Sequence, residues 1–383
     1  MYSVSDFGGM IEDKIRTTAY AEALRGAVSE GSVVLDIGTG TGVFALLACQ
    51  MGAKKVYAIE PAGAILVGRE MARDNGFEDR IEFLQALSTD VEPPRHVDVV
   101  VSDLRGCLPL LGPSVQTIVD ARERWLKPEG VLIPKSDTMW AAPFEAEEFY
   151  AANYERPWLK NDLDLDMRAG HPIAVNNWRH ARLDPKFMLA DPAKLTTLDY
   201  RHISDPNIRA RVELKATRDA VMHGFHVWFE ACLAPGISFS SSPGSPKLVY
   251  GTAFFPLEAP VRVTSGDSID LSFRAHLVGG DYVWQWDTRV SEGGARESTK
   301  AEFGQSTFLG TPLSLDKVRK RSEEFSGTLN DKGKIDARIL ELIGEGMTLG
   351  EVGRVLTREY PKRFPTWRDA LSRAGALAVK YCK

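Results

Sequence analysis

Residues 31 to 135 alternate between short apolar runs and longer amphipathic runs, and this alternation constrains the fold more than any other feature of the sequence. The short runs, such as SVVLDIG, KVYAIE and VDVVVSD, are β-branched and apolar on both faces. Strands of this kind occur in parallel sheets that are covered by helices on each side. The alternation therefore predicts an α/β domain built on a parallel, Rossmann-like sheet.

A glycine cluster, Gly38, Gly40 and Gly42 in VVLDIGTGTG, follows the first of these strands and precedes a helical run. Glycines at such a turn let the backbone approach a bound ligand closely. A dinucleotide site prefers G-x-G-x-x-G, whereas the spacing here is G-x-G-x-G with Asp36 just before it. Glu60 ends the next strand and is placed to accept hydrogen bonds from ribose hydroxyls. The pattern favours S-adenosylmethionine over NAD.

After Pro134 the pattern changes, because β-like runs such as KLVYGTAFF and DYVWQWDTRV follow one another with turn residues between them. This predicts an antiparallel barrel or sandwich, with an aromatic and charged excursion at residues 150 to 190. Past residue 315 the chain reads as helical, with Thr348 and Thr366 placed as helix caps. We therefore expect three domains, at residues 1–135, 136–315 and 316–383.

The composition excludes several classes of protein. The net charge of -5 is too mild to predict a nucleic-acid partner for the whole chain. Residues 316–383 carry 15 Lys and Arg against 10 Asp and Glu, a balance of +5 that marks a separate module. The four cysteines are scattered without zinc-like spacing, and no run approaches the ~20 apolar residues of a membrane span. We expect a reduced, cytoplasmic protein that binds no metal and no membrane.

The segment MIEDKIRTTAY, beginning at Met10, lies one helix upstream of the glycine turn. Together with VVLDIGTGTG, Glu60, ARERWLKPEGVLIP (121–134) and HGFHVWFEACL, it resembles the protein arginine methyltransferases. The resemblance runs from about residue 5 to about residue 300. It implies a class I methyltransferase domain, a substrate-side β-barrel with a dimerisation arm at about 150–190, and a homodimer. It also implies S-adenosyl-L-methionine as cofactor and S-adenosyl-L-homocysteine as product.

The resemblance assigns the cofactor contacts residue by residue. The carboxylate of S-adenosylmethionine would be bound by Arg16, the methionine end lined by Asp36 and Gly38, the ribose held by Glu60 and the adenine contacted by Leu87 and Ser88. The family's aromatic N-terminal cover is thin here, with Tyr2 and Phe7 the only candidates.

Two motifs depart from the family. The loop VSDLRGCLPLLG matches the double-glutamate loop, which grips a substrate guanidinium with two carboxylates. Asp103 occupies the first glutamate position, one methylene shorter, and Gly112 occupies the second, so that carboxylate is absent. Arg105 would repel a guanidinium if it points inward. In the barrel, residues 247–249 stand roughly where the family has a Thr-His-Trp turn, and no histidine stands there.

A general base can come from Asp103, or from His223 or His226 in VMHGFHVWFE. Strand alternation puts the two histidines on opposite faces, so at most one faces a given pocket. Histidines in such strands are more often structural than catalytic bases. The catalytic candidates are therefore Asp103, Arg105 and His223.

A closed pocket without two anions pairs a charged guanidinium poorly, which costs several kcal/mol. We therefore expect a methyltransferase that acts on a small-molecule or modified-peptide acceptor, whose carboxylate Arg105 can hold. Two alternatives stay open: a genuine protein arginine N-methyltransferase, and a non-catalytic regulator that binds S-adenosylmethionine. The C-terminal module reads as a small three-helix or winged-helix-like module. We expect it to dock a peptide or cap the barrel, because its mixed charges argue against nucleic acid.

Overall fold

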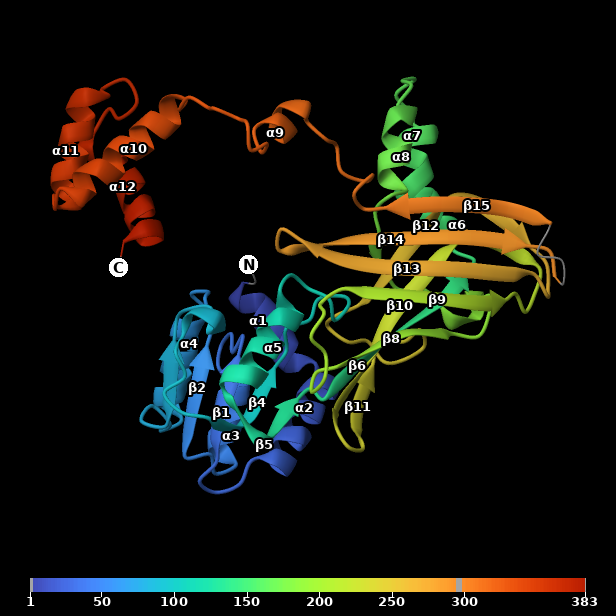
Figure 1. Ribbon diagram of the computed structural model, residues 1–383, viewed down its shortest axis with the longest axis horizontal. Coiled ribbons are helices and arrows are strands. Elements are labelled where there is room, and N and C mark those ends of the chain that lie inside the picture. Colours follow the sequence, from blue (N-terminus) through green and yellow to red (C-terminus); the bar gives the residue numbers. More distant parts are fainter. Residues whose placement is uncertain (1–2, 294–297, 383) are drawn as a thin grey trace. The chain divides into compact units, whose positions relative to one another are not determined.

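The computed structural model describes residues 3–293 and 298–382 and divides into two compact units, Met1–Pro312 and Leu313–Lys383. Figure 1 shows the first unit as a helix-flanked parallel sheet joined to a layer of long antiparallel strands. None of the helices in the described ranges is both long enough and apolar enough to cross a membrane.

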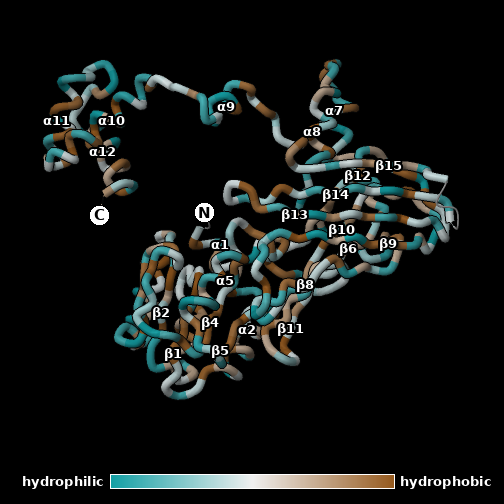
Figure 2. The backbone as a smooth tube through the Cα atoms, viewed as in Figure 1, coloured by the Kyte–Doolittle hydropathy of each residue, from teal (hydrophilic) through white to brown (hydrophobic). Residues whose placement is uncertain are grey.

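A five-stranded parallel sheet, with strand order β3-β2-β1-β4-β5, forms the first layer. Its central strand β1 is buried along its whole length, and hydrophobic residues colour this sheet brown in Figure 2. The strand order reverses between β1 and β4, and ligands of open α/β sheets bind at such a switch point. The elements are α1 (Val4–Glu12), α2 (Lys14–Ala27), β1 (Val33–Ile37), α3 (Val43–Gln50), β2 (Lys55–Ile59), α4 (Ile65–Asp74), β3 (Ile81–Leu84), η1 (Ser88–Asp90), β4 (Val97–Ser102), α5 (Ser114–Arg124) and β5 (Leu126–Ile133).

Two antiparallel sheets follow, one with the order β7-β12-β10-β6-β8 plus β11 beside β10, the other with the order β15-β14-β13-β9. Buried side chains alternate along β13 and most of β14, as expected where one face of a sheet packs in a core. The strands are β6 (Ser136–Phe144), β7 (Arg179–Ala181), β8 (Ala193–Asp199), β9 (Ile208–Lys215), β10 (Ala220–Ala234), β11 (Ile237–Ser240), β12 (Thr252–Val263), β13 (Ser268–Val278), β14 (Asp281–Ser291) and β15 (Thr299–Ser306).

The predicted excursion at residues 150–190 is a run of short helical segments between β6 and β8, interrupted by the short strand β7. Its exposed leucines include Leu163 and Leu165, which are 67% and 62% exposed. The segments are α6 (Glu147–Tyr150), the π-helix η2 (Ala151–Glu155), α7 (Arg156–Leu159), η3 (Arg168–Gly170), α8 (His171–Ala174) and η4 (Pro185–Phe187).

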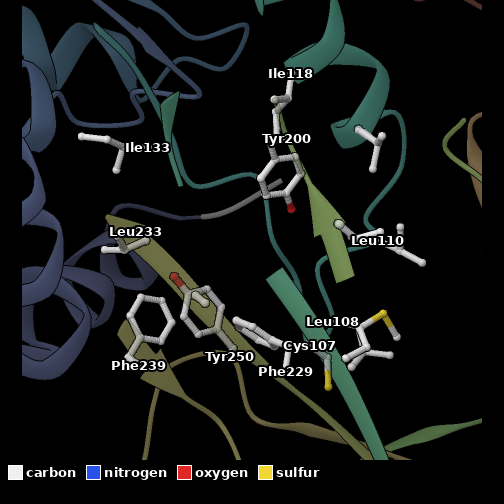
Figure 3. Packing of buried hydrophobic residues seen from close by; sticks show 14 of the residues in the cluster. Cys107, Leu108, Leu110, Ile118, Ile133, Tyr200, Phe229, Leu233, Phe239 and Tyr250 are labelled. Carbon is white, nitrogen blue, oxygen red and sulfur yellow. The ribbon is translucent and has the colours of Figure 1, made fainter. Parts of the chain in front are cut away.

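One apolar core runs from the parallel sheet into the barrel-like strands. Figure 3 shows Ile118 and Ile133 of the α/β layer in the same cluster as Tyr200 and Leu233 of the antiparallel layer. Arginine contacts in both directions add to this core. Arg122 of α5 donates to the carbonyl oxygens of Tyr200 and Ile203, and Arg201 donates to those of Pro128 and Gly130. The two layers therefore hold a fixed relation at the carboxyl ends of β1 and β4. The predicted fold class, a class I methyltransferase sheet followed by antiparallel β structure and a helical C-terminal module, is confirmed.

The second unit contains α9 (Leu315–Arg319), an exposed stretch at 320–330, and the helices α10 (Asp331–Gly344), α11 (Leu349–Glu359) and α12 (Trp367–Tyr381). These last three helices bury a small core of their own that includes Ile339. Thr348 and Thr366 each form a capping box, so their prediction as helix caps is confirmed. No strand occurs within residues 313–382, so of the two expected forms the module has the three-helix one and lacks the strands of a winged helix.

Candidate active site

The glycine turn after β1 forms a narrow cradle. Gly38, Gly40 and Gly42 have φ angles of +70°, +56° and +84°, which L side chains rarely adopt. A Cβ at Gly40 would lie 2.3 Å from the ring of Phe7, and one at Gly38 would lie 2.7 Å from the side chain of Leu104. Only glycine therefore lets α1 and the loop after β4 approach this turn so closely.

Two carboxylates, those of Asp36 and Glu60, hold the glycine turn through hydrogen bonds. Asp36 Oδ2 accepts hydrogen bonds from Thr39 Oγ1 at 2.5 Å and from the backbone N–H of Ala45 at 3.0 Å. Glu60 accepts from the backbone N–H groups of Gly40 and Ala62 at 3.1 and 2.8 Å. Burial raises the pKa of Asp36 to about 7, against the hydrogen bonds that lower it. Asp36 Oδ1 is buried and has no hydrogen-bond partner among the described residues, so it is free to accept one from a ligand.

Arg16 projects from the first turns of α2 and is buried over the rings of Tyr20 and Phe44. Its Nη1 donates to the carbonyl oxygen of Met10 at 3.1 Å, and its Nε and Nη2 lie 2.6 Å from Asp103 Oδ2. A guanidinium has five N–H groups, so two remain for another acceptor. Its guanidinium lies 5.1 Å from the ring centre of Phe44, two residues beyond Gly42, and its charge partly offsets the rise in the pKa of Asp36 that burial causes.

The remaining cofactor candidates lie after β3 and in α1. Ser88 is buried at the start of η1, where its carbonyl oxygen accepts from Arg124 Nη2 at 2.9 Å, whereas Leu87 beside it is 56% exposed. Phe7, one of the two aromatic candidates for the N-terminal cover, packs against Gly40. The other candidate, Tyr2, lies outside the described residues.

Asp103 follows β4 directly and is bound from both sides of the layer junction. Besides Arg16, its Oδ2 accepts a hydrogen bond from Tyr250 Oη at 2.6 Å. Its Oδ1 accepts from Arg105 Nη1 at 2.9 Å, and the side chain is only 8% exposed. The single carboxylate of the degenerate loop is thus shared by two arginines and a tyrosine.

Arg105 points inward and is held by Asp137, a residue of β6 that the sequence analysis did not single out. Its Nε and Nη2 donate to Asp137 Oδ2 and Oδ1 at 2.8 and 2.9 Å. Its Nη1 also donates to Tyr20 Oη at 2.6 Å, and Tyr200 Oη donates to Asp137 Oδ2 at 2.6 Å. Four of its five N–H groups are therefore engaged. The expectation that Arg105 holds a carboxylate of the acceptor is corrected, because a carboxylate of the chain already holds it.

Arg16, Asp103, Arg105 and Asp137 together form what we call the Asp103 cluster, with two positive and two negative charges. Burial opposes ionisation of Asp103, but Arg16 and Arg105 outweigh it, and the pKa of Asp103 lies below its usual range. Burial likewise disfavours the charged form of Arg105, yet Asp137 reverses this and raises its pKa. The formal charges of the two arginines and the two aspartates cancel, so the cluster is electrically balanced.

The barrel supplies Tyr250 directly after residues 247–249, which stand roughly where the family has its Thr-His-Trp turn. The backbone N–H of Val249 donates to Asp13 Oδ2 at 2.8 Å, and the next residue, Tyr250, carries the polar group that reaches Asp103. Figure 3 shows the ring of Tyr250 beside Phe239 and Phe229, the two rings against which the guanidinium of Arg105 packs. Gly112, at the position of the missing glutamate, has a φ of +49°.

The two histidines lie elsewhere. His223 Nδ1 accepts from the backbone N–H of Ala146 at 3.2 Å, and its ring packs near Tyr150. His226 pairs with Thr252 at 2.6 Å, and burial lowers its pKa to about 4. The residue of β10 that reaches Arg105 is Phe229, six residues beyond His223, which corresponds to ~20 Å of strand. The expectation that His223 acts as the base is corrected by this distance.

The residues around the glycine turn fit S-adenosylmethionine. Arg16 keeps two N–H groups for a carboxylate, the unpaired Asp36 Oδ1 suits an ammonium group, and Glu60 keeps acceptor capacity for hydroxyl groups. The turn itself lies at the switch point of the sheet. When bound, this cofactor would supply a methyl group already activated by its sulfonium sulfur.

Two family models match the chain. "Ribosomal protein L11 methyltransferase (PrmA)" matches residues 16–149, and "Arginine methyltransferase oligomerization subdomain" matches residues 135–283. The probable protein arginine N-methyltransferase 6 of Arabidopsis thaliana is 30% identical over 246 residues, covering 62% of this chain but only 55% of the relative. Protein arginine N-methyltransferase PRMT10 of Oryza sativa subsp. japonica is 30% identical over 306 residues, covering 69% of this chain and 78% of the relative.

The chain belongs to the protein arginine methyltransferase family. As a family member it is an S-adenosylmethionine-dependent methyltransferase, so the predicted resemblance, enzyme class and cofactor are confirmed. An arginine N(omega)-methyltransferase of Streptomyces achromogenes subsp. streptozoticus is 29% identical over 273 residues, 68% of this chain and 73% of that relative. The Trypanosoma brucei PRMT1 enzyme-prozyme complex with AdoHcy matches with a TM-score of 0.71 at 22% identity, over 78% of this chain and 96% of that chain, and shows the fold.

Proposed function

We propose that this chain transfers a methyl group from S-adenosylmethionine to a guanidinium nitrogen of arginine in a peptide or protein. The observation that carries the proposal is the ionised, largely buried carboxylate of Asp103 beside Arg16. The names of the Arabidopsis and rice relatives, both protein arginine N-methyltransferases, support the same acceptor. The coarser reading, a methyltransferase, follows from family membership alone.

Asp103 can anchor a guanidinium because one of its oxygens retains capacity. Oδ2 is bonded to Arg16 and Tyr250, whereas Oδ1 has a single hydrogen-bond donor, Arg105 Nη1, among the contacts described above. A carboxylate oxygen accepts two hydrogen bonds, so Oδ1 can accept one more N–H group. Hydrogen bonds between guanidinium and carboxylate are charge-assisted and therefore strong.

The reaction requires little acid–base catalysis from the side chains. The N–C bond forms as the S–C bond of the sulfonium breaks, the electron pair of that bond stays on the sulfur of S-adenosylhomocysteine, and the guanidinium nitrogen gives up one proton to solvent water. Because the pKa of Asp103 lies below its usual range, this carboxylate orients the acceptor and does not keep the proton. Alignment of the two reacting atoms then supplies the catalysis, for which good positioning contributes ~7 to 11 kcal/mol.

The main argument for a small-molecule acceptor was that Arg105 would bind its carboxylate. That argument no longer applies, because Arg105 already pairs with Asp137. Free arginine remains a small molecule that carries the proposed group, and the name of the Streptomyces relative does not mention a protein. The test therefore compares the two forms of the same guanidinium.

The experiment incubates the purified full chain with methyl-labelled S-adenosylmethionine and three acceptors. These are a Gly/Arg-rich peptide, the same peptide with lysine in place of every arginine, and free arginine. We expect label on the arginine peptide alone, recovered as methylarginine after hydrolysis. Label on free arginine alone would replace the protein acceptor with a small molecule. Absence of label in all three, with S-adenosylhomocysteine binding verified by calorimetry, would overturn the proposal.

A second candidate is a catalytically silent relative that binds the cofactor and acts as a regulator. It is favoured by the balanced charge of the Asp103 cluster and by Gly112, which provides no second carboxylate. This candidate predicts tight binding of S-adenosylhomocysteine without methyl transfer to any fraction of a cell extract. The same labelling experiment therefore separates it from the first.

We also propose that the chain forms a homodimer through its excursion at residues 150–190. Leu159, Leu163 and Leu165 expose apolar surface there, and the oligomerization-subdomain model covers this segment. Light scattering should give twice the mass of the chain, and Leu163→Asp with Leu165→Asp should give the mass of one chain. An unchanged mass for the double variant would remove the excursion from the interface.

A further inference from the structure

The charge balance of the Asp103 cluster raises a problem for a cationic acceptor. Arg16 and Asp103 lie 2.6 Å apart, Arg105 and Asp103 2.9 Å apart, and Arg105 and Asp137 2.8 Å apart. The side chains of all four residues are at most 8% exposed, so water screens them little. A guanidinium that approached this cluster would add a third positive charge to a buried group that is already neutral, and buried unpaired charge is strongly unfavourable.

Arg16 is the member of the cluster that can release Asp103 from this balance. It lies beside Asp103 and 5.1 Å from the ring centre of Phe44, two residues beyond Gly42, and it has two N–H groups left for a carboxylate of the cofactor. The ammonium group of the cofactor has its own counter-charge, because Asp36 is nearby and its Oδ1 lacks a partner within the described residues. Once Arg16 shares its charge with that carboxylate, Asp103, Arg105 and Asp137 are left with a net charge of -1.

We propose that Arg105 and Asp137 hold Asp103 in electrical balance, so that Asp103 can bind a cationic acceptor only after Arg16 has engaged the cofactor. This inference rests on the proposed function and adds an order of binding to it. Arg105 and Asp137 are positioning residues in this scheme, since they act through Asp103 and touch neither reacting atom.

The charge count makes each residue's contribution distinct. Without the charge of Arg105, the cluster would carry -1 before the cofactor binds, and the acceptor would no longer depend on it. Without the charge of Asp137, the cluster would carry +1 before the cofactor binds and would be only neutral afterwards. Removal of both charges leaves Arg16 balanced against Asp103, so the dependence on cofactor should return.

The first test uses the wild-type chain and two cofactor probes. S-adenosylhomocysteine carries the carboxylate that Arg16 can bind, whereas 5′-methylthioadenosine has the nucleoside but lacks the amino acid. Calorimetry measures the affinity of the Gly/Arg-rich peptide with each probe at saturation. We expect the peptide to bind about tenfold more tightly with S-adenosylhomocysteine than with 5′-methylthioadenosine or with no probe, a typical size for coupling between two sites. Equal affinities in the three conditions would overturn the proposal.

The second test uses Arg105→Gln, Asp137→Asn and the double variant. The ratio of peptide affinities with and without S-adenosylhomocysteine should fall to about one in Arg105→Gln and recover to the wild-type value in the double variant, since binding coupled through charge follows the net charge. Asp137→Asn should bind the peptide more weakly than wild type even with S-adenosylhomocysteine. A ratio that stays at the wild-type value in Arg105→Gln would overturn the proposal, because a merely structural role would lower affinities without changing their ratio.

The outcomes separate this inference from the proposed function. Methyl transfer to the arginine peptide together with equal peptide affinities would keep the function and remove the order of binding. No transfer and no peptide binding with S-adenosylhomocysteine would remove both. If Arg105→Gln does not fold, the comparison of probes on the wild-type chain and the Asp137→Asn variant still decides the matter.

Discussion

Tyr250 Oη donates a 2.6 Å hydrogen bond to Asp103 Oδ2, joining two residues that are 147 positions apart in the chain. Arg16 Nε lies 3.1 Å from the same hydroxyl. The carboxylate is therefore fixed by the α/β layer on one side and by the antiparallel layer on the other. A site built this way keeps its geometry only while both layers stay in register.

Tyr250→Phe should lower the free energy of unfolding by about 2 kcal/mol, since it removes a hydrogen bond to a buried charged group and keeps the ring that stacks on Phe239. Tyr282→Phe is a matched control, because its hydroxyl donates to the neutral carbonyl oxygen of Pro206 at 2.9 Å. The control should lose only about 1 kcal/mol. Urea denaturation measures both values, and an equal loss in the two variants would contradict the special status of the Asp103 contact.

Gly40→Ala should damage the cofactor turn. The new Cβ would meet the ring of Phe7 at 2.3 Å, and an L residue in the left-handed region costs roughly 1 to 2 kcal/mol. We expect S-adenosylhomocysteine to bind at least about tenfold more weakly, the factor that corresponds to such a cost. Gly26→Ala in α2 is the control, since nothing lies within 4 Å of its added Cβ, and its affinity should equal that of wild type. Wild-type affinity in Gly40→Ala would show that Phe7 and the turn can give way.

Glu60→Ala should weaken binding of S-adenosylhomocysteine at least tenfold, because one charge-assisted contact contributes about 1.5 to 3 kcal/mol. The change also frees the backbone N–H of Gly40, which loosens the turn. Glu82→Ala on the neighbouring strand β3 is the control, as that side chain is exposed and forms an ion pair with the partly exposed Lys55. Calorimetry at constant pH compares the three proteins, and unchanged affinity in Glu60→Ala would refute the assignment of the ribose site.

Asp36 should make the stability of the ligand-free chain fall as pH rises. Burial raises its pKa to about 7 in the folded chain, against the usual 3.8, so folding favours the protonated form. The resulting stabilisation is fully present below pH 3.8 and is lost as pH rises through about 7. Between pH 5 and 8 the wild type should lose about 2 kcal/mol more than Asp36→Asn. Chemical denaturation at both pH values measures the difference, and parallel curves for the two proteins would show that Asp36 ionises normally.

The parallel sheet and the cofactor turn could be predicted because their determinants are local. Runs such as VVLDI are apolar on both faces, and the glycine spacing lies within five residues. Glu60 could be placed by its position at the end of β2. Local patterns of this kind indicate the conformation of a segment and the kind of ligand that binds beside that segment. They can be interpreted without knowing which distant residues pack against the segment.

The acceptor side of the site could not be predicted, because its polar groups meet across the two layers. Asp137 is 32 residues from Arg105, and Tyr250 is 147 residues from Asp103. One signal was present, since Asp137 is a charged residue within a strand that continues into the apolar run MWAAPF. A carboxylate that is fully buried in a strand requires a cation nearby. No partner within the chain had been predicted for Arg105, so it was a candidate for that cation.

The two histidines illustrate a different error, in which a catalytic role was predicted for residues that lie away from the site. A histidine beside an aromatic run invited a catalytic reading, although the strand β10 is buried through most of its length and offers its histidines only packing partners and backbone or hydroxyl groups. Alternation along a strand assigns faces, but it does not say which face borders the site. In β10 that choice depends on where Phe229 lies against Arg105.

The bidentate pair between Arg105 and Asp137 also governs how this sequence can change over generations. Loss of either residue leaves the buried charge of the other without its partner, whereas exchange of both for neutral residues does not. Each single substitution should therefore destabilise the chain more than the paired exchange does, and the two positions are expected to vary together among descendants of this sequence.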